Sequence, residues 1–79
     1  MDVTIFTGPG CVSCQRAKAF LRDHQIEFTE RDVAADPAAV EELVKRGCRR
    51  LPVILIDGDV VQGFDLQDLV QRLRLPQPP

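Results

Sequence analysis

The sequence predicts an α/β protein in which a mixed four-stranded sheet is flanked by three helices, in the order βαβαββα. Short β-branched runs alternate along the chain with segments whose apolar residues recur at helical spacing. Two of the predicted helices follow an aspartate that is suited to cap them. An Asp-Gly pair between two apolar runs predicts a tight hairpin. These observations favour a single domain over residues 1–75, followed by a disordered tail at 76–79.

The first strand and the first helix flank a glycine-rich break. Residues 3–6 are β-branched and aromatic, which predicts a buried strand. The Gly-Pro-Gly run at 8–10 ends it. A helix is predicted over residues 12–23, with Ala17, Phe20 and Leu21 on its apolar face.

A second strand and a second helix follow. Residues 26–33 predict a strand with Ile26 and Phe28 on one face. Asp36 is suited to cap a helix that begins at a proline and ends near Gly47. The predicted apolar stripe of this helix is Val40, Leu43 and Val44.

The last part of the chain predicts a hairpin and a helix. Residues 53–56 form the most strand-like run, and Asp57-Gly58 turns the chain into a fourth strand around Val60. Asp65 caps the last helix, which Pro76 ends. Its stripe consists of Leu66, Leu69, Val70 and Leu73. The first two strands, joined through a helix, should be parallel, and the last two antiparallel.

Bulk composition narrows the function. The formal net charge of −2 gives no electrostatic reason to expect a nucleic acid or an anionic membrane as partner. No apolar run approaches the roughly 20 residues that span a bilayer, and no signal peptide is evident. We therefore expect a cytoplasmic protein, and a monomer is the default expectation. In that reducing compartment, three cysteines indicate catalysis or metal binding more than a structural disulfide framework.

Residues 11–14, which read Cys-Val-Ser-Cys, are the predicted catalytic site. Cys11 lies where the first helix begins, so unpaired N–H groups and the helix dipole favour its thiolate. Cys14 follows almost one turn later and can close a disulfide with Cys11. Cysteines in such positions have a pKa of roughly 3.5–7.5, against about 8.5 for an ordinary thiol. We expect the Cys11 thiolate to attack a substrate disulfide, and Cys14 to resolve the mixed disulfide.

Structural zinc sites use the same cysteine spacing, so a metal site remains an alternative. Such sites normally need four ligands, and this chain offers only His24 and Cys48 besides Cys11 and Cys14. Neither forms a second paired motif. We predict no metal and no cofactor, and we expect Cys48 to be a small buried hydrophobe or else a regulatory thiol.

The second motif is Leu51-Pro52, directly before a predicted strand. Proline cannot donate to a β-ladder, so its place at the entrance of a central strand needs an explanation. Only roughly 5–6% of X–Pro bonds are cis, yet the topology favours cis here. A cis bond would turn the backbone of Leu51 toward the thiols, where it could pair with an extended substrate.

The chain resembles the glutaredoxin superfamily, which has the thioredoxin fold, and within it the NrdH-type redoxins. The resemblance covers about residues 2–74. Its carriers are Thr-Ile-Phe-Thr at 4–7, Cys-Val-Ser-Cys at 11–14, Arg-Gly-Cys-Arg-Arg-Leu-Pro-Val at 46–53 and Gly-Phe-Asp at 63–65. The resemblance implies a cis Pro52 and places Gly63 and Phe64 beside the active site.

The resemblance also implies the partners. NrdH-type redoxins are recharged by thioredoxin reductase and deliver electrons to ribonucleotide reductase. Glutaredoxins usually carry a lysine before the CxxC loop for a glutathione carboxylate, and this chain has Thr7-Gly8 there. A glutathione-dependent glutaredoxin and, less favoured, a thiol-ligated iron–sulfur or metal-binding module are the alternatives. The expected binding residues for substrate or partner are Val12, Ser13, Arg49, Leu51, Pro52, Gly63, Phe64 and Asp65.

Overall fold

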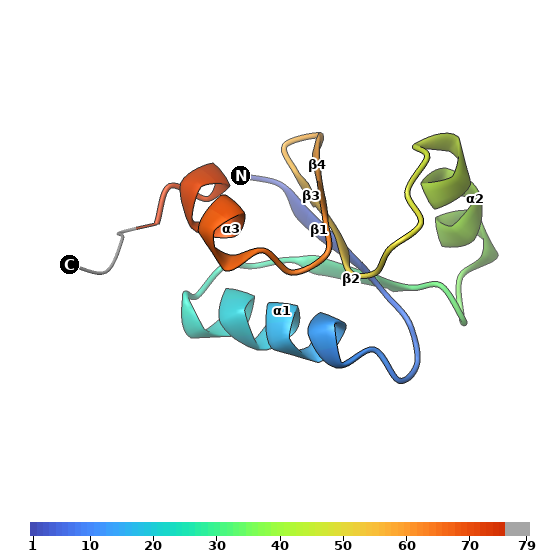
Figure 1. Cartoon of the computed structure of the whole chain (residues 1–79), viewed down its shortest axis with the longest axis horizontal. Coiled ribbons are helices and arrows are strands. Elements are labelled where there is room, and N and C mark those ends of the chain that lie inside the picture. Colours follow the sequence, from blue (N-terminus) through green and yellow to red (C-terminus); the bar gives the residue numbers. More distant parts are fainter. Residues whose placement is uncertain (76–79) are drawn as a thin grey trace.

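Figure 1 shows the computed structural model, which describes residues 1–75. The elements are β1 (Val3–Thr7), α1 (Val12–Asp23), β2 (Thr29–Asp32), α2 (Pro37–Lys45), β3 (Val53–Ile56), β4 (Asp59–Gln62) and α3 (Leu66–Arg72). The predicted order βαβαββα is confirmed. The predicted tail at 76–79 lies outside the described residues.

The four strands form one mixed sheet in the order β2-β1-β3-β4. β1 pairs parallel with β2, while β1–β3 and β3–β4 are antiparallel, as predicted. Ile5 faces Ile54, which in turn faces Val61, so one apolar row crosses the three strands on the same face. The turn between β3 and β4 places Asp57 and Gly58 at φ of 50° and 90°, the backbone geometry that the Asp-Gly signal predicts.

The helices lie on both sides of this sheet (Figure 1). α1 and α3 share one face, where the larger core cluster consists of Val3, Ile5, Ala17, Leu21, Ile54, Ile56, Val61, Leu69 and Leu73. α2 covers the other face, where the smaller cluster consists of Phe6, Ala39, Leu43, Cys48 and Val53. The fold is therefore a three-layer α/β arrangement with an unequal division of the core.

The helix ends follow from local chemistry. Asp36 accepts hydrogen bonds from the N–H groups of Ala38 and Ala39, and Asp65 accepts one from Asp68, so both predicted caps are confirmed. α2 ends with Gly47 in the left-handed region at φ 71°. This is the Schellman geometry that glycine favours.

The second strand is shorter than predicted, because its first residues are used to close α1. Gln25 adopts φ 57°, and the N–H of Ile26 donates to the carbonyl of Leu21 at 2.9 Å. Parallel pairing then begins at Thr29, opposite Thr4. The prediction of a strand from residue 26 was therefore wrong, although Ile26 and Phe28 do pack against the larger core cluster.

The apolar stripes of α2 and α3 are also narrower than predicted. Leu43 is buried, but Val40 and Val44 expose 44% and 71% of their surface. Ala39 takes the second core-facing position of α2. At the start of α3, Leu66 is 50% exposed. The predicted burial of these three side chains was wrong, since each helix presents a different edge of its stripe to the sheet.

Candidate active site

The two cysteines lie where β1 passes into α1. Cys11 is the N-cap of α1, with extended backbone at φ −86° and ψ 101°. The N–H of Cys14 donates to the Cys11 sulfur at 3.1 Å, so the sulfur takes the place that an oxygen holds in an ordinary N-cap. No acidic residue stands in the first turn of α1. The helix start therefore favours negative charge on Cys11, as the sequence predicts.

The two sulfurs differ in accessibility. Cys11 and Cys14 are joined as a disulfide, with their Cα atoms 5.2 Å apart. Cys14 is fully buried, at 0% exposure, whereas Cys11 is half-buried and the neighbouring Val12 is 64% exposed. Ser13 is also exposed. An incoming group can therefore reach Cys11 but not Cys14.

The Leu51–Pro52 peptide bond is cis, which confirms that prediction. The Leu51 side chain packs against the backbone of Gly8, in the loop that precedes Cys11. A Cβ built on Gly8 would lie 2.9 Å from Leu51 Cδ1. The carbonyl of Pro52 accepts a hydrogen bond from the N–H of Gly63 at 2.7 Å. Leu51 thus reaches the loop that leads to Cys11, and Pro52 is tied to the Gly63 segment.

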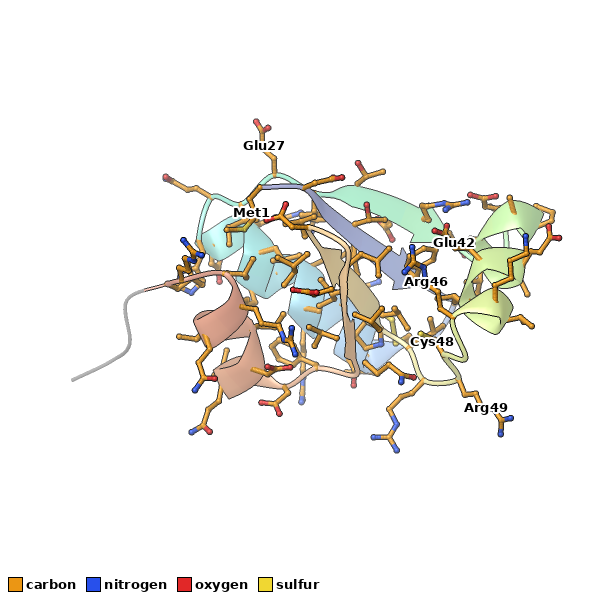
Figure 2. The ribbon with its side chains drawn as sticks, turned by 90° about the horizontal axis from the view of Figure 1, so that it is seen from above. Met1, Glu27, Glu42, Arg46, Cys48 and Arg49 are labelled. Carbon is orange, nitrogen blue, oxygen red and sulfur yellow. A yellow bond between two sulfur atoms is a disulfide. The ribbon has the colours of Figure 1, made fainter. Side chains whose placement is uncertain are left out.

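The other predicted binding residues, Phe64, Asp65 and Arg49, differ in how far they are free to contact a partner. Phe64 packs edge-on against Phe20 of α1, with ring centroids 6.1 Å apart, so part of this ring belongs to the core. Asp65 is exposed, and its carboxylate caps α3. The Arg49 N–H donates to the side-chain oxygen of Gln62 at 3.2 Å, and its guanidinium points away from the ribbon (Figure 2).

Sequence reasoning missed a buried polar group on α1. Lys18 follows Cys14 by one helical turn and is only 9% exposed. Its ammonium donates to the Glu30 carboxylate at 3.0 Å, and the same carboxylate oxygen accepts from the Thr7 hydroxyl at 2.8 Å. The Thr7 bond, followed by the Lys18 bond, holds the pKa of Glu30 below its ordinary value. The i, i+4 spacing from Cys14 is the one signal that could have drawn attention to Lys18.

A second ion-pair network fastens α2 to the sheet. Arg31 of β2 pairs with Asp36 at 3.1 Å and also with Glu42. Its guanidinium lies over the Phe6 ring, 5.2 Å from the centroid. The hydrogen bond from Arg31 holds the pKa of Asp36 below its ordinary value. Because Asp36 also caps α2, one cation joins the helix start, the helix body and the strand.

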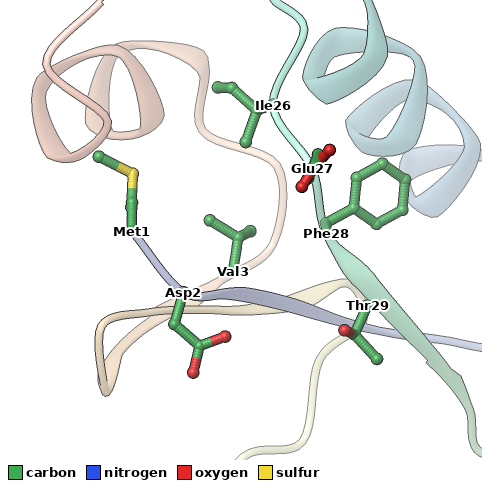
Figure 3. Close-up of a pocket in the computed structure, with 7 residues that line it drawn as sticks. All are labelled: Met1, Asp2, Val3, Ile26, Glu27, Phe28 and Thr29. Atoms are coloured by element: carbon green, nitrogen blue, oxygen red, sulfur yellow. The ribbon is translucent and has the colours of Figure 1, made fainter.

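A separate hollow has a volume of about 590 Å³, and Figure 3 shows the residues that line it. It is lined by the first residues of β1, such as Asp2 and Val3, and by the segment around Phe28 before β2. These residues lie at the opposite end of β1 from the dithiol loop, so this hollow carries no part of the redox site.

Within residues 1–75, no cluster of three or more His, Cys, Asp or Glu side chains is placed to hold a metal ion. No helix in the same range is long and apolar enough to cross a membrane.

The fold and the cysteine pair define a thioredoxin-like redox protein. A family model described as glutaredoxin matches residues 3–61, and the chain belongs to the glutaredoxin family. It is 33% identical to the NrdH-redoxin of Escherichia coli, with a TM-score of 0.84, and the match covers 99% of this chain and 100% of that one. It is 38% identical to the glutaredoxin of Brucella melitensis, with a TM-score of 0.68, over 90% of this chain and 78% of that one.

Curated relatives match over a shorter stretch. The global transcriptional regulators Spx 1 of Oceanobacillus iheyensis and Spx of Bacillus subtilis are 44% and 42% identical over 41 residues. Those residues make up 52% of this chain and 31% of each regulator. The chain therefore spans about a third of the length of these relatives.

Proposed function

We propose that this protein is a dithiol electron donor that reduces disulfides in other proteins. The observation that carries the proposal is the unequal exposure of the two sulfurs at the start of α1. Cys11 is accessible and accepts a backbone hydrogen bond, while Cys14 is buried beside it. This arrangement suits an attacking thiolate and a resolving thiol.

The two steps balance as follows. The Cys11 thiolate attacks one sulfur of the substrate disulfide, forms a mixed disulfide and releases the other substrate sulfur as a thiolate. Cys14 loses its proton and attacks the Cys11 sulfur, which forms the Cys11–Cys14 disulfide and releases the second substrate sulfur. The protein loses two electrons and the Cys14 proton, and the substrate gains both electrons. One released substrate thiolate takes up the Cys14 proton, and the other takes a proton from water.

Docking of the substrate is assigned to the surface around Cys11. Leu51 offers its backbone groups to an extended segment, in the manner of strand addition. Pro52, whose carbonyl is bonded to the Gly63 N–H, borders that segment. Val12 and Ser13 border the attacking sulfur on the first turn of α1. Gly63 is included because its N–H is hydrogen-bonded to the Pro52 carbonyl. The exposed part of Phe64 adds an apolar contact.

The same surface favours a protein reductant over glutathione. Glutathione carries two carboxylates, which need fixed cationic donors. The Thr7 hydroxyl is bonded to Glu30, and the Asp65 carboxylate stands at the start of α3. Arg49 and Arg50 are exposed, and no ion pair within residues 1–75 fixes the position of either guanidinium. Thioredoxin reductase is therefore the proposed electron source. Ribonucleotide reductase, in the cytoplasm, is the proposed acceptor, by analogy with NrdH-redoxin, and the protein acts as a monomer.

The test measures reduction of the Cys11–Cys14 disulfide by NADPH with thioredoxin reductase and, separately, by millimolar glutathione with glutathione reductase. We expect efficient turnover in the first assay and poor turnover in the second. The opposite result would assign a glutathione-dependent glutaredoxin while preserving the dithiol chemistry. Visible absorption after anaerobic purification would instead indicate an iron–sulfur module.

The match to the Spx regulators favours a second candidate, a redox-sensing domain. In that role, the disulfide state of Cys11 and Cys14 is read by a partner protein and no electrons are passed onward. Multiple turnovers with excess disulfide substrate separate the two. A donor consumes many equivalents of substrate, whereas a sensor is oxidised once and stops.

A further inference from the structure

A groove of about 180 Å³ lies between α2 and the segment that precedes β3. We refer to it as the α2 groove. Its lining residues are Val33, Val40, Leu43, Val44, Cys48, Arg49, Arg50 and Leu51. The following inference rests on the proposed function and names the kind of substrate that the protein binds.

The wall of the α2 groove is aliphatic. Val40 and Val44 are two of the three side chains that the helical pattern of α2 predicts to be core, yet they expose 44% and 71% of their surface. A single exposed valine needs no explanation. Here, however, the two valines border a hollow that Leu43, Cys48 and Leu51 also line, so they form a continuous apolar surface.

One end of the α2 groove borders the dithiol loop. Leu51 and Val33, which both line the groove, are the nearest neighbours of a Cβ built on Gly8, at 2.9 and 3.4 Å. Gly8 precedes Cys11 by three residues. A substrate segment whose cysteine is attacked by Cys11 can therefore continue over Leu51 into the groove.

The other lining residues add uncompensated positive charge. Arg49 and Arg50 are exposed, and no carboxylate within residues 1–75 lies within ion-pair distance of either. By contrast, Arg46 on the same side of the molecule pairs with Glu42 at 3.4 Å (Figure 2). The stem of Arg50 passes 3.4 Å from a Cβ built on Gly63. This places one of the two cations beside the proposed docking surface.

We propose that the α2 groove binds an extended segment of the substrate protein that carries acidic and aliphatic residues next to the disulfide. The aliphatic side chains occupy the wall formed by Val40, Val44 and Leu51. The carboxylates face Arg49 and Arg50, whose charges have no partner within the described chain. Charges at the rim of an interface chiefly guide association and fix register, so this groove selects among disulfides without altering the chemistry at Cys11.

The probes are three short synthetic peptides with the same intramolecular disulfide. The first is flanked by glutamate and leucine, the second by lysine and leucine, and the third by glutamate and serine. The fully reduced protein is mixed with excess peptide and quenched with acid, and its remaining thiols are alkylated and counted by mass spectrometry. This single-turnover rate needs no reductase, and 2-hydroxyethyl disulfide gives the basal rate.

We expect the glutamate–leucine peptide to react fastest. Arg49→Glu with Arg50→Glu should lower its rate constant by about tenfold, because each exposed ion pair contributes up to roughly fivefold. Val40→Gln with Val44→Gln should lower it about threefold, since both valines are already partly exposed and the loss is confined to apolar contact. Val40→Gln with Val44→Gln should leave the rate with 2-hydroxyethyl disulfide unchanged.

Lys45→Glu is the matched control. Lys45 lies on the same helix, but it lines a separate hollow with Arg31 and Glu41. Lys45→Glu reverses one charge and the double variant reverses two, so an effect of net charge alone would lower its rate constant about threefold. A loss of that size in Lys45→Glu would overturn the inference. Equal rates for the glutamate and lysine peptides, or binding of a second copy of this chain in the groove, would overturn it as well. Failure to reduce any disulfide, including the small one, would instead contradict the proposed function.

Discussion

The two faces of the sheet differ in what holds their helices. On the α1 face, two helices pack over the larger core cluster, and Leu21 and Leu69 are fully buried. On the α2 face, a single nine-residue helix buries only Ala39 and Leu43 and is fastened by ion pairs to Arg31. The face that carries the reacting sulfurs is thus the one with the deeper apolar packing, and the face with the α2 groove is the thinner one.

This difference fits the division of labour between chemistry and recognition. The attacking sulfur needs a fixed position over a helix start, which dense packing supplies. A surface that binds a partner segment needs exposed side chains, which the shallow core of the α2 face leaves available. Each of the following predictions tests how separate the two faces are.

The largest effect is expected at the cysteines. Cys11→Ser should lower disulfide reduction by at least about a thousandfold, because serine is not ionised at neutral pH and is a poor nucleophile. Cys14→Ser should instead trap a mixed disulfide with the substrate, detectable by mass spectrometry. Cys48→Ala, on the α2 face, should retain activity. Alkylation of Cys14 ahead of Cys11 in the reduced protein would contradict the assigned order of attack.

Core truncations compare the two clusters directly. Leu21→Ala should lower the free energy of unfolding by about 4 kcal/mol, and Leu43→Ala by about 2 kcal/mol, because Leu21 is fully buried and Leu43 lies at the margin of a smaller cluster. Urea unfolding followed by far-ultraviolet circular dichroism measures both values. Equal losses would show that the two faces form one cooperative core without the proposed asymmetry.

The Lys18–Glu30–Thr7 network is expected to contribute less. The Glu30 carboxylate has its pKa held below the ordinary value by its two donors, so its stabilising contribution is present above that ordinary value and is lost as pH falls through the folded pKa. Glu30→Gln should cost about 1 kcal/mol at neutral pH, a modest value because the side chain is 34% exposed. Unfolding at a series of pH values should show this difference shrinking below about pH 4. A difference that is constant with pH would rule out the ion pair as its source.

The smallest effect is expected at Gly8, where the loop before Cys11 lies against Leu51. A methyl group there would approach Leu51 Cδ1 to 2.9 Å, and the flexible leucine side chain can move aside. Gly8→Ala should therefore leave stability nearly unchanged and lower the rate with protein disulfides about threefold, a misplacement effect that small disulfides should not show. An equal loss with both substrates would place the damage at Cys11 itself.

Local signals in the sequence predicted most of the fold. Asp36 and Asp65 cap helices, and Asp57-Gly58 turns a hairpin, because these conformations depend on a few neighbouring atoms. The position of Cys11 at a helix start followed from the Gly-Pro-Gly break and the helical pattern after it. The cis bond at Pro52 followed from topology and family resemblance, since the dipeptide alone favours trans.

Features that depend on distant partners were not predictable in the same way. On α2, residues 39, 40, 43 and 44 offer two overlapping apolar edges, and the ion pairs of Arg31 with Asp36 and Glu42 accompany the edge that faces the sheet. Lys18 looks like any solvated helix residue until the register of β2 places Glu30 beside it. The apolar residues Ile26 and Phe28 predict a strand from residue 26 because they do pack against the core. The backbone at residue 26 closes α1 instead, and the sheet begins only later.

The burial of Cys14 behind an accessible Cys11 has a kinetic consequence. In the proposed function, the reductase and the disulfide substrate must both approach the Cys11 sulfur, so they compete for the same surface and cannot bind it together. The catalytic cycle is then an alternation of two half-reactions, one that loads electrons and one that delivers them. Initial-rate plots at several acceptor concentrations should accordingly give parallel lines, and a high concentration of either partner should slow the half-reaction of the other.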